Sequence, residues 1–375
     1  MAEILFAASA DSRPDLVSDP HSGLSSALGY SDFMHLANAH APRRMLAFLL
    51  LPSAPQKTAF FRTPPFLCGL SPDFRKRSTM RSMNRRTFIG ASIAAAVAAS
   101  RPAWAAERHQ IDRVGLQLYT VRDLMKSDFD GTIAKVAQLG YKEVEFAGYF
   151  GKSPQDVRKI LDNNKLTSPS EHVPYETVEK KWPETLEAAH VMGHKFVVCP
   201  WIEIPQRKEP DGWKRAAAVF NQAGEAAQKA GIQFAYHNHA FEFEPSEALG
   251  GKLPYDFLLA ETDPKLVKME MDLCWMTVAG RDPLEYFNRY PGRFPLVHVK
   301  DFSTKPPAND YDGATGPASK AGHVADPGQG EVDFKRVFAQ SSKGGIQHYF
   351  VENDEPKSPF DDLKVSYDYV AKLRF

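Results

Sequence analysis

Side chains that can bind a metal ion end four strand-like runs in the second half of the chain. Each run is rich in apolar residues, and the residues that end them are His237, Asp272, His298 and Glu352. Two imidazoles and two carboxylates, once brought together, make a suitable site for a divalent cation. Asp272 closes a largely apolar run, where an unpaired carboxylate is costly, so a cation or hydrogen bonds must satisfy it.

The elements that must position these residues alternate regularly from about residue 108 onward. Strand-like segments are predicted at residues 114–120, 143–147, 167–172, 195–199, 232–239, 267–275, 295–301 and 347–353. Each is followed by a segment of helical length, for example residues 175–192, and several of these stop at a glycine such as Gly140, Gly193 or Gly231. This rhythm predicts an α/β fold, a (β/α)8 TIM barrel, in which all C-terminal strand ends meet at one open face.

A doubly wound open sheet alternates in the same way but usually has a glycine-rich phosphate turn after its first strand. The corresponding segment, Leu118-Tyr-Thr-Val-Arg122, contains no glycine. The barrel is therefore the favoured interpretation, as a single domain over residues 107–375 that follows a leader.

Residues 83–106 have the composition and order of an export signal. Arg85 and Arg86 precede an Ala-rich apolar stretch, which is followed by Ala103-Trp-Ala105, a small-x-small cleavage site. The paired arginines with Phe88 behind them resemble a twin-arginine signal. The apolar stretch is too short to span a bilayer core of ~30 Å. We expect cleavage near Ala105, a periplasmic or exported protein, and no stable membrane insertion after cleavage.

Residues 1–82 are rich in Pro, Ser and Ala and have no sustained periodicity. Because an export signal belongs at the N-terminus of a precursor, we expect translation to start at Met83. The preceding residues are then a disordered extension or lie upstream of the true start.

Charge and cysteine content argue against several classes of protein. The 46 Lys and Arg residues balance 46 Asp and Glu residues, so no nucleic-acid or membrane-surface partner is indicated. Cys68, Cys199 and Cys274 form no close pair, which argues against a disulfide framework or a zinc knuckle. Cys199 and Cys274 lie in strand-like runs and are expected to be buried thiols.

Four motifs resemble the xylose isomerase-like barrel superfamily. They are Tyr236-His-Asn-His-Ala-Phe-Glu-Phe243, Met271-Asp-Leu-Cys-Trp275, Val297-His-Val-Lys-Asp301 and Val351-Glu-Asn353. The superfamily contains sugar phosphate isomerases/epimerases, inosose dehydratases and isomerases, ketose 3-epimerases and apurinic endonucleases. The resemblance covers about residues 110–375, and its motifs are specific for the superfamily rather than for a substrate.

The resemblance implies one divalent ion, which is Mn²⁺, Mg²⁺, Co²⁺ or Zn²⁺. In the superfamily its ligands stand at the ends of strands five to eight and are usually Glu, Asp, His and Glu. Asp272, His298 and Glu352 match the last three, whereas His237 stands where the family has its glutamate. Either His237 takes over as the ligand, or the site uses His239 or Glu242 instead.

Catalytic roles follow from the same resemblance. A metal-chelated carbonyl–hydroxyl pair has an acidified α-proton, which a nearby base can remove. Glu352 is the leading base, because the family uses this position as both ligand and catalyst. His239, Glu145 and His172 are candidates for a second acid/base or for contacts with substrate hydroxyls.

Further side chains are expected at the substrate. Lys300, next to His298 in the sequence pattern, is predicted to stabilise an oxyanion. Trp201 and Trp275 stand at the ends of strands four and six, where they either stack on a sugar face or pack in the core. Together with His172, these residues form the predicted substrate-binding set.

The predicted function is that of a metal-dependent sugar isomerase/epimerase, or a related lyase, acting on a free or oxidised sugar, polyol or glycoside through enediolate chemistry. One alternative is a noncatalytic sugar-binding barrel, which would hold no metal. Another is an apurinic endonuclease, which needs a multi-zinc cluster and a basic surface that faces DNA. We expect a small-molecule carbohydrate partner and no nucleic acid. A homo-oligomer is also compatible, because many barrels of this family form dimers or tetramers.

Overall fold

The computed structural model describes residues 109–304 and 324–375. One compact unit contains Ile111–Leu373, and the ends of the described chain, residues 109–110 and 374–375, belong to a second unit. The predictions for residues 1–82, the export signal at residues 83–106 and Cys68 lie outside the described residues.

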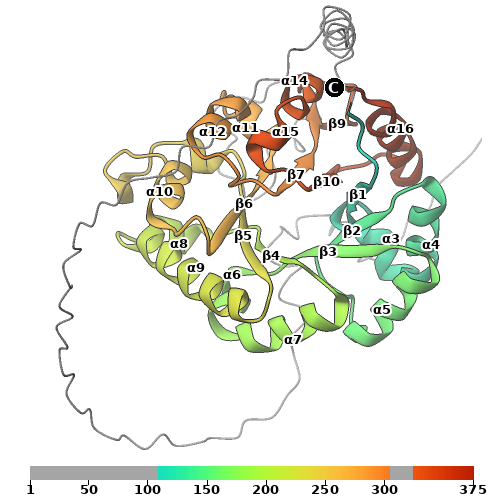
Figure 1. Cartoon of the computed structure of the whole chain (residues 1–375), viewed down its shortest axis with the longest axis horizontal. Coiled ribbons are helices and arrows are strands. Elements are labelled where there is room, and N and C mark those ends of the chain that lie inside the picture. Colours follow the sequence, from blue (N-terminus) through green and yellow to red (C-terminus); the bar gives the residue numbers. More distant parts are fainter. Residues whose placement is uncertain (1–108, 305–323) are drawn as a thin grey trace, which may run out of the picture. The chain divides into compact units, whose positions relative to one another are not determined.

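Eight parallel strands close into a barrel, which confirms the predicted fold (Figure 1). Going round the barrel, the strand order is β1, β10, β7, β6, β5, β4, β3 and β2. The strands are β1 (Val114–Gln117), β2 (Glu143–Phe146), β3 (Thr167–His172), β4 (Phe196–Cys199), β5 (Gln233–His237), β6 (Val267–Asp272), β7 (Leu296–Val299) and β10 (His348–Val351). A separate antiparallel pair, β8 (Asp301–Phe302) and β9 (Val324–Ala325), follows β7 and was not predicted.

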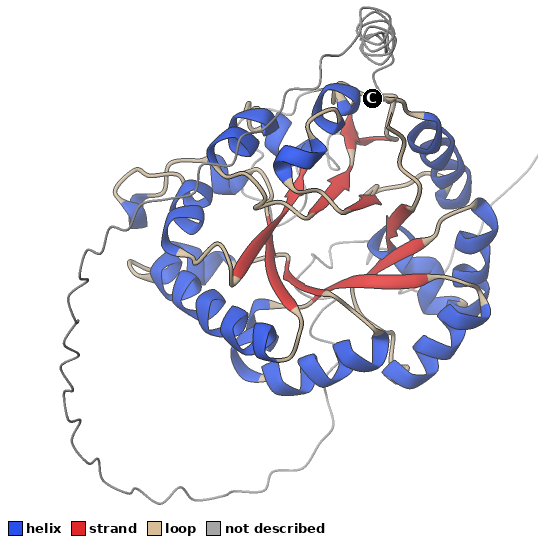
Figure 2. Cartoon of the chain, viewed as in Figure 1, coloured by secondary structure: helices blue, strands red, loops and turns tan. Residues whose placement is uncertain are grey.

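Helices surround the strands as an outer ring (Figure 2). They are α3 (Arg122–Ser127), α4 (Phe129–Leu139), α5 (Pro154–Asn163), α6 (Tyr175–Lys180), α7 (Trp182–Met192), α8 (Ile204–Lys208), α9 (Gly212–Lys229), α10 (Pro254–Glu261), α11 (Leu273–Val278), α12 (Pro283–Arg289), α14 (Phe334–Phe338), α15 (Ser341–Gly344) and α16 (Pro359–Lys372). The described residues also form three 3-10 turns: η1 (Leu118–Val121), η2 (Phe241–Phe243) and η3 (Glu247–Leu249).

Local sequence signals explain several of these boundaries. Ser153 caps α5 by accepting a hydrogen bond from the Asp156 amide at 3.1 Å, and Pro154 stands in the first turn. The predicted stop at Gly140 is confirmed, because this residue ends α4 with a φ of 116°, a conformation that favours glycine.

Some predicted elements were too long. The helix predicted at residues 175–192 is split into α6 and α7, and Pro183 stands in the first turn of α7. Proline has no amide hydrogen to donate and clashes with the preceding turn, so the helix restarts there. The strand predicted at residues 267–275 ends at Asp272, because the Asp272 carboxylate accepts a hydrogen bond from the Trp275 amide and starts α11 at once.

Alternate residues of each strand face the barrel interior. An apolar cluster on this inner face consists of Phe196, Val198, Ala235, Leu296 and Phe350. Two residues further along their strands, Ala235 and Leu296 are followed by His237 and His298. The polar residues therefore lie toward the C-terminal end of the barrel, and the apolar cluster packs on their N-terminal side.

Cys199 and Cys274 are buried free thiols, as predicted. In the part of the chain that the structure describes, no helix combines the length and the apolar character needed to cross a membrane.

Candidate metal centre and active site

The barrel brings together all four strand-end residues named from the sequence. His237 and Asp272 end β5 and β6, His298 lies within β7, and Glu352 directly follows β10. In the strand register, Asp272 pairs with His298. All four residues are buried, with exposed fractions between 0% and 5%. Neighbouring strands of one sheet thus present two imidazoles and two carboxylates to one region.

Asp272, His298 and Glu352 form what we call the outer group. Each offers a ligand atom, and these atoms lie within 4.8 Å of one another. The Nδ1 atom of His298 is 2.9 Å from Glu352 Oε2 and 4.0 Å from Asp272 Oδ2. The Nε2 atom of His237 lies 4.0 Å from the same Asp272 oxygen, so His237 borders this group.

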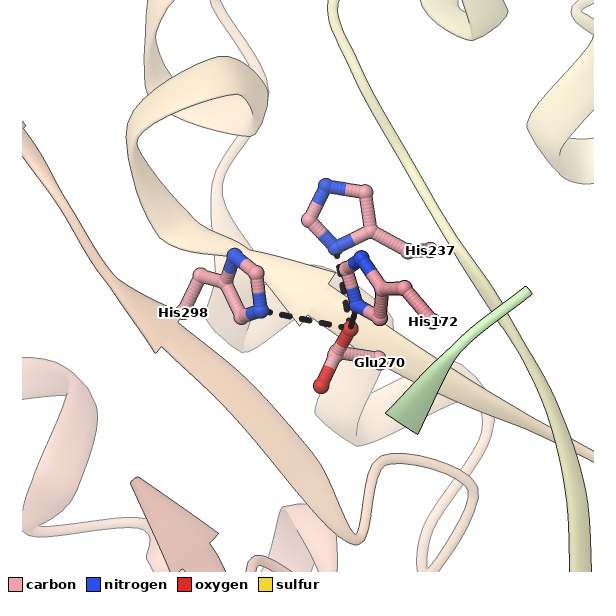
Figure 3. A group of neighbouring side chains, drawn as sticks. All are labelled: His172, His237, Glu270 and His298. Carbon is pink, nitrogen blue, oxygen red and sulfur yellow. Dashed lines mark hydrogen bonds and ion pairs between the residues drawn. The ribbon is translucent and has the colours of Figure 1, made fainter. Parts of the chain in front are cut away.

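A second set of ligand atoms, the inner group, consists of His172, His237, Glu270 and His298 (Figure 3). Its centre is a single oxygen, Glu270 Oε2. This atom lies 2.6 Å from His172 Nε2, 3.1 Å from His237 Nδ1 and 3.3 Å from His298 Nε2. The two groups therefore share His298, whose two ring nitrogens face opposite ways.

Glu145, a predicted acid/base residue, lies against the inner group. Its Oε2 atom is 2.8 Å from His298 Nε2 and 3.2 Å from His172 Nε2. The same oxygen accepts a hydrogen bond from Gln117 Nε2 at 2.8 Å. Glu145 is fully buried, and its contacts are with the histidine rings and Gln117.

Charges of the inner group compensate one another. Burial lowers the pKa of His172, but the carboxylates of Glu145 and Glu270 outweigh this effect and raise it to about 9. Burial and the neighbouring Glu145 raise the pKa of Glu270, yet His298 and His172 lower it to about 2. Burial and the neighbouring His298 hold the pKa of His237 well below its usual range. Against the effect of burial, Glu270 and Glu352 raise the pKa of His298 well above its usual range, and His172 lowers the pKa of Glu145. At neutral pH the two glutamates are therefore ionised, His172 and His298 are cationic and His237 is neutral.

The carboxylate of Asp272 is only half satisfied. Its Oδ1 atom accepts the Trp275 amide hydrogen bond at 2.8 Å. Its Oδ2 atom is buried and has no hydrogen-bond partner among the described residues. Burial raises the pKa of Asp272 to about 7, although Lys300 and His298 act in the opposite direction. When Asp272 is ionised, a cation close to this oxygen would stabilise the buried charge, and with His298 Nδ1 and Glu352 beside it the donor set fits a divalent metal ion.

Lys300, predicted at the substrate, contacts the outer group. Its Nζ atom lies 3.0 Å from Glu352 Oε2 and 3.8 Å from Asp272 Oδ2. It is also 2.6 Å from Asp354 Oδ2 and 5.1 Å from the ring centre of Trp275. These carboxylates raise the pKa of Lys300 well above its usual range against the effect of burial, so the amine stays charged.

An aromatic wall stands beside His237. The His239 ring lies 5.0 Å from the rings of both Trp201 and His237, and 5.9 Å from that of Trp275. Burial and then Lys300 hold the pKa of His239 well below its usual range, so the imidazole is neutral. Its Nδ1 atom and Trp275 Nε1 are buried and lack hydrogen-bond partners in the described part of the chain. Three predicted site residues therefore meet at one wall.

Glu242, the other candidate from strand five, is used elsewhere. Its carboxylate accepts hydrogen bonds from the Tyr236 hydroxyl at 2.7 Å and from the His239 amide at 2.8 Å. Of the alternatives for the strand-five ligand, His237 is the one whose nitrogen approaches Asp272.

Sequence reasoning missed Glu270 and Asp354. Glu270 stands two residues before Asp272, so strand alternation places both carboxylates on the inner face. Asp354 stands two residues after Glu352 and holds Lys300 from the other side. The sequence did contain a signal for both residues, because each stands two positions from a predicted metal ligand.

The carboxylate of Asp301, just beyond β7, holds the segment that follows β9 by hydrogen bonds. Asp301 accepts four backbone hydrogen bonds, from Phe302 at 2.9 Å and from Gly328, Gly330 and Val332 at 3.0 Å each. Gly328 has a φ of 89°, and a Cβ atom at Gly330 would collide with Asp301. Both glycines are therefore needed for this tight turn.

Comparison with known proteins agrees with this barrel. The family model described as "Xylose isomerase-like TIM barrel" matches residues 133–364. An inosose dehydratase of Lacticaseibacillus casei is 26% identical over 260 residues, which cover 62% of this chain and 85% of that protein.

Two solved structures share the fold. A sugar phosphate isomerase/epimerase from Parabacteroides distasonis is 28% identical, with a TM-score of 0.57 over 69% of this chain and 98% of that one. A xylose isomerase-like TIM barrel protein from Mycobacterium smegmatis, in complex with magnesium, is 14% identical, with a TM-score of 0.51 over 70% and 96% of the two chains.

Proposed function

This chain belongs to the xylose isomerase-like TIM-barrel family, and on that premise we propose that it is a metal-dependent enzyme acting on a sugar or polyol next to a carbonyl group. The observation that carries the proposal is the buried Asp272 Oδ2 atom, which has no hydrogen-bond partner among the described residues and faces His298 and Lys300. The inosose dehydratase and sugar phosphate isomerase/epimerase relatives support the choice of substrate class.

Asp272, His298 and Glu352 would hold the ion, with His237 as a fourth ligand. A bound divalent ion would withdraw charge from a substrate carbonyl and so acidify the neighbouring C–H bond. Imidazole and carboxylate donors of this kind suit Mn²⁺, Co²⁺ and Zn²⁺, and carboxylates also suit Mg²⁺.

The side chains around the outer group divide the remaining work. Lys300 and His298 hold the pKa of Glu352 well below its usual range against the effect of burial, which makes this carboxylate a better ligand than base. His239 is neutral and has a buried Nδ1 atom without a hydrogen-bond partner in the described chain, so we assign it the proton transfer. Lys300 donates hydrogen bonds to a substrate oxygen on which negative charge develops.

The fate of the removed proton decides the reaction type. Return of the proton to another position gives an isomer or epimer, whereas loss of a neighbouring hydroxyl or alkoxyl group gives dehydration or glycoside cleavage. Both outcomes begin with the same proton removal, which is the step that the site residues support.

Hydrogen exchange with solvent tests this shared step directly. The purified full chain would be stripped of metal, reloaded with Mn²⁺, Co²⁺, Zn²⁺ or Mg²⁺, and incubated in D2O with a panel of keto-sugars and inososes. We expect metal-dependent deuterium incorporation or dehydration of at least one compound, about one bound ion per chain by elemental analysis, and loss of both in Asp272→Ala and His298→Ala. A wild-type protein that binds none of these ions would overturn the enzyme proposal and favour a sugar-binding barrel.

We also propose that the natural substrate is unphosphorylated. The predicted twin-arginine signal with Arg85 and Arg86 would place the enzyme outside the cytoplasm, where free sugars and glycosides are the available carbohydrates. In addition, Glu352 and Asp354 already offset the charge of the Lys300 amine, so this amine can donate a hydrogen bond to a partly charged oxygen but does not balance the full charge of a phosphate group. If the native host kept the protein in the cytoplasm, with no cleaved form in the periplasm or the medium, the export proposal would be contradicted.

A further inference from the structure

We propose that Glu270 and Glu145 are positioning residues that keep a proton on Nδ1 of His237 and on Nε2 of His298. The other nitrogen of each ring thereby faces Asp272. In His237 this nitrogen is a lone pair for the metal, whereas His298 Nδ1 also faces Glu352 and would release its hydrogen when the ion binds. The inner group is then a hydrogen-bonded support for the metal site and does not itself hold the ion. This inference rests on the proposed function for its purpose, but the positions of the two protons can be tested without a metal.

The two rings share the same arrangement. His237 points Nδ1 at Glu270 Oε2, 3.1 Å away, and its Nε2 lies 4.0 Å from Asp272 Oδ2. His298 points Nε2 at Glu145 Oε2, 2.8 Å away, and its Nδ1 lies 4.0 Å from Asp272 Oδ2. A ring nitrogen that faces a carboxylate at hydrogen-bond distance carries the hydrogen, which leaves Nε2 of His237 as the acceptor or metal ligand. His298 Nδ1 also lies 2.9 Å from Glu352 Oε2, so it carries a hydrogen in the metal-free protein and must release it to become a ligand.

The inner and outer groups differ in whether their polar atoms already have hydrogen-bond partners. Every ligand nitrogen of the inner group already has a carboxylate acceptor, because His172, His237 and His298 all converge on Glu270 Oε2 (Figure 3). In the outer group, by contrast, Asp272 Oδ2 has no hydrogen-bond partner among the described residues. An ion placed in the inner group would displace hydrogen bonds without supplying a missing one. An ion in the outer group would displace the contacts of Glu352 with His298 and Lys300, but it would also supply the partner that Asp272 Oδ2 lacks.

The two glutamates are themselves held in place. Gln117 donates a hydrogen bond to Glu145 at 2.8 Å. His172 lies 2.6 Å from Glu270 and 3.2 Å from Glu145, and its ring is parallel to that of His298 within 7°, with the ring centres 5.3 Å apart. We therefore assign His172, predicted as a substrate contact, to this support, where it connects the two carboxylates.

Nuclear magnetic resonance of the metal-free full chain, labelled with ¹⁵N at histidine, reports which ring nitrogen carries the hydrogen. We expect His237 in the Nδ1–H form, which is the less common form for a histidine in water. In Glu270→Gln the signals of His237 should shift toward the Nε2–H form. Titration with Zn²⁺ should show a metal affinity about 10- to 100-fold weaker, the usual effect of losing such a partner. Glu145→Gln provides the second variant, in which His298 should lose its hydrogen on Nε2 and keep the one on Nδ1, beside Glu352, with a similar loss of affinity.

Glu143→Gln is the matched control. Glu143 is also a buried glutamate of β2, and it accepts a hydrogen bond from a histidine, His348 Nδ1, at 2.7 Å. Because it stands two residues before Glu145, toward the N-terminal end of the barrel, its substitution should leave the Zn²⁺ affinity unchanged.

Two results would overturn the inference. One is an Nε2–H form of His237 in the wild-type protein. The other is an unchanged His237 signal and unchanged Zn²⁺ affinity in Glu270→Gln. If the wild-type chain bound no metal but His237 carried its hydrogen on Nδ1 only while Glu270 was present, the proposed function would fail and the positioning role would stand.

Discussion

Asp272→Asn should make the metal-free protein more stable at pH 8 while weakening its hold on metal. The substitution removes a buried charge whose Oδ2 atom has no hydrogen-bond partner among the described residues. It keeps an oxygen in place to accept the Trp275 amide hydrogen bond that starts α11. The amide is nearly isosteric with the carboxylate, so the packing around it is preserved.

The magnitude follows from the raised pKa. Folding raises the pKa of Asp272 from 3.8 to about 7, so the folded state binds more protons than the unfolded state between these two values. Stability contributed by this group therefore falls as the pH rises through that window and is lowest above pH 7. At about 1.4 kcal/mol per pKa unit, the ionised group costs about 4 kcal/mol at pH 8 and about 2 kcal/mol at pH 5. The unpaired amide hydrogens of the new asparagine cost about 1–3 kcal/mol. The free energy of unfolding should therefore rise by about 1–3 kcal/mol at pH 8 and not at all at pH 5.

Urea unfolding of both proteins in EDTA at pH 8 and pH 5 measures this difference, and a third series contains Zn²⁺. Metal at 100 times its dissociation constant should stabilise the wild type by about 2.7 kcal/mol and the variant by less, so the stability advantage of the variant should shrink when Zn²⁺ is added. Asp301→Asn is the control, because its carboxylate accepts four backbone hydrogen bonds and its loss should destabilise the protein with or without metal. An Asp272→Asn protein that is less stable than the wild type in EDTA at pH 8 would refute the reasoning.

Three further outcomes test the site. Metal affinity should increase about tenfold per pH unit up to pH 7, where Asp272 with its pKa of about 7 becomes ionised, which Zn²⁺ titration at several pH values measures. His239→Gln should lower the rate of substrate deuterium exchange about 10²- to 10⁴-fold with little change in metal affinity, and an equal loss of both would argue against a role in proton transfer. His237→Glu adds a carboxylate and should shift the metal preference toward Mg²⁺ and Mn²⁺, which competition with Zn²⁺ would reveal; an unchanged preference would place His237 outside the ligand set.

The barrel and its strand-end residues could be predicted because both are local patterns. Most strands were recognisable from their apolar runs, and His237, Asp272 and Glu352 were recognisable as polar residues at the ends of such runs. The exception is β3, whose sequence Thr167-Ser-Pro-Ser-Glu-His172 contains no apolar run. The limits of the elements were harder to predict. The sequence of residues 267–275 reads as one apolar run and does not reveal that Asp272 caps a helix. Capping depends on the backbone turning at that residue.

The inner group was not predictable in the same way. Glu270 is a second carboxylate on a strand that already carries a predicted ligand, and a buried glutamate is acceptable only when charges from other strands compensate it. Those charges come from His172 and His298, on β3 and β7, which meet Glu270 only when the barrel closes. The contacts of Glu145 likewise depend on its position along the barrel axis, which cannot be read from the sequence pattern.

The shared ring of His298 has a consequence for how this site can evolve. Glu145 contacts one of its nitrogens and Glu352 the other, so two glutamates far apart in the chain act on each other through one imidazole. Their substitutions should be epistatic: the effect of losing Glu352 should depend on whether Glu145 still orients the ring. Among homologous chains, a change at one of these positions is then expected to accompany a change at the other, and His298 should be the last of the three to vary.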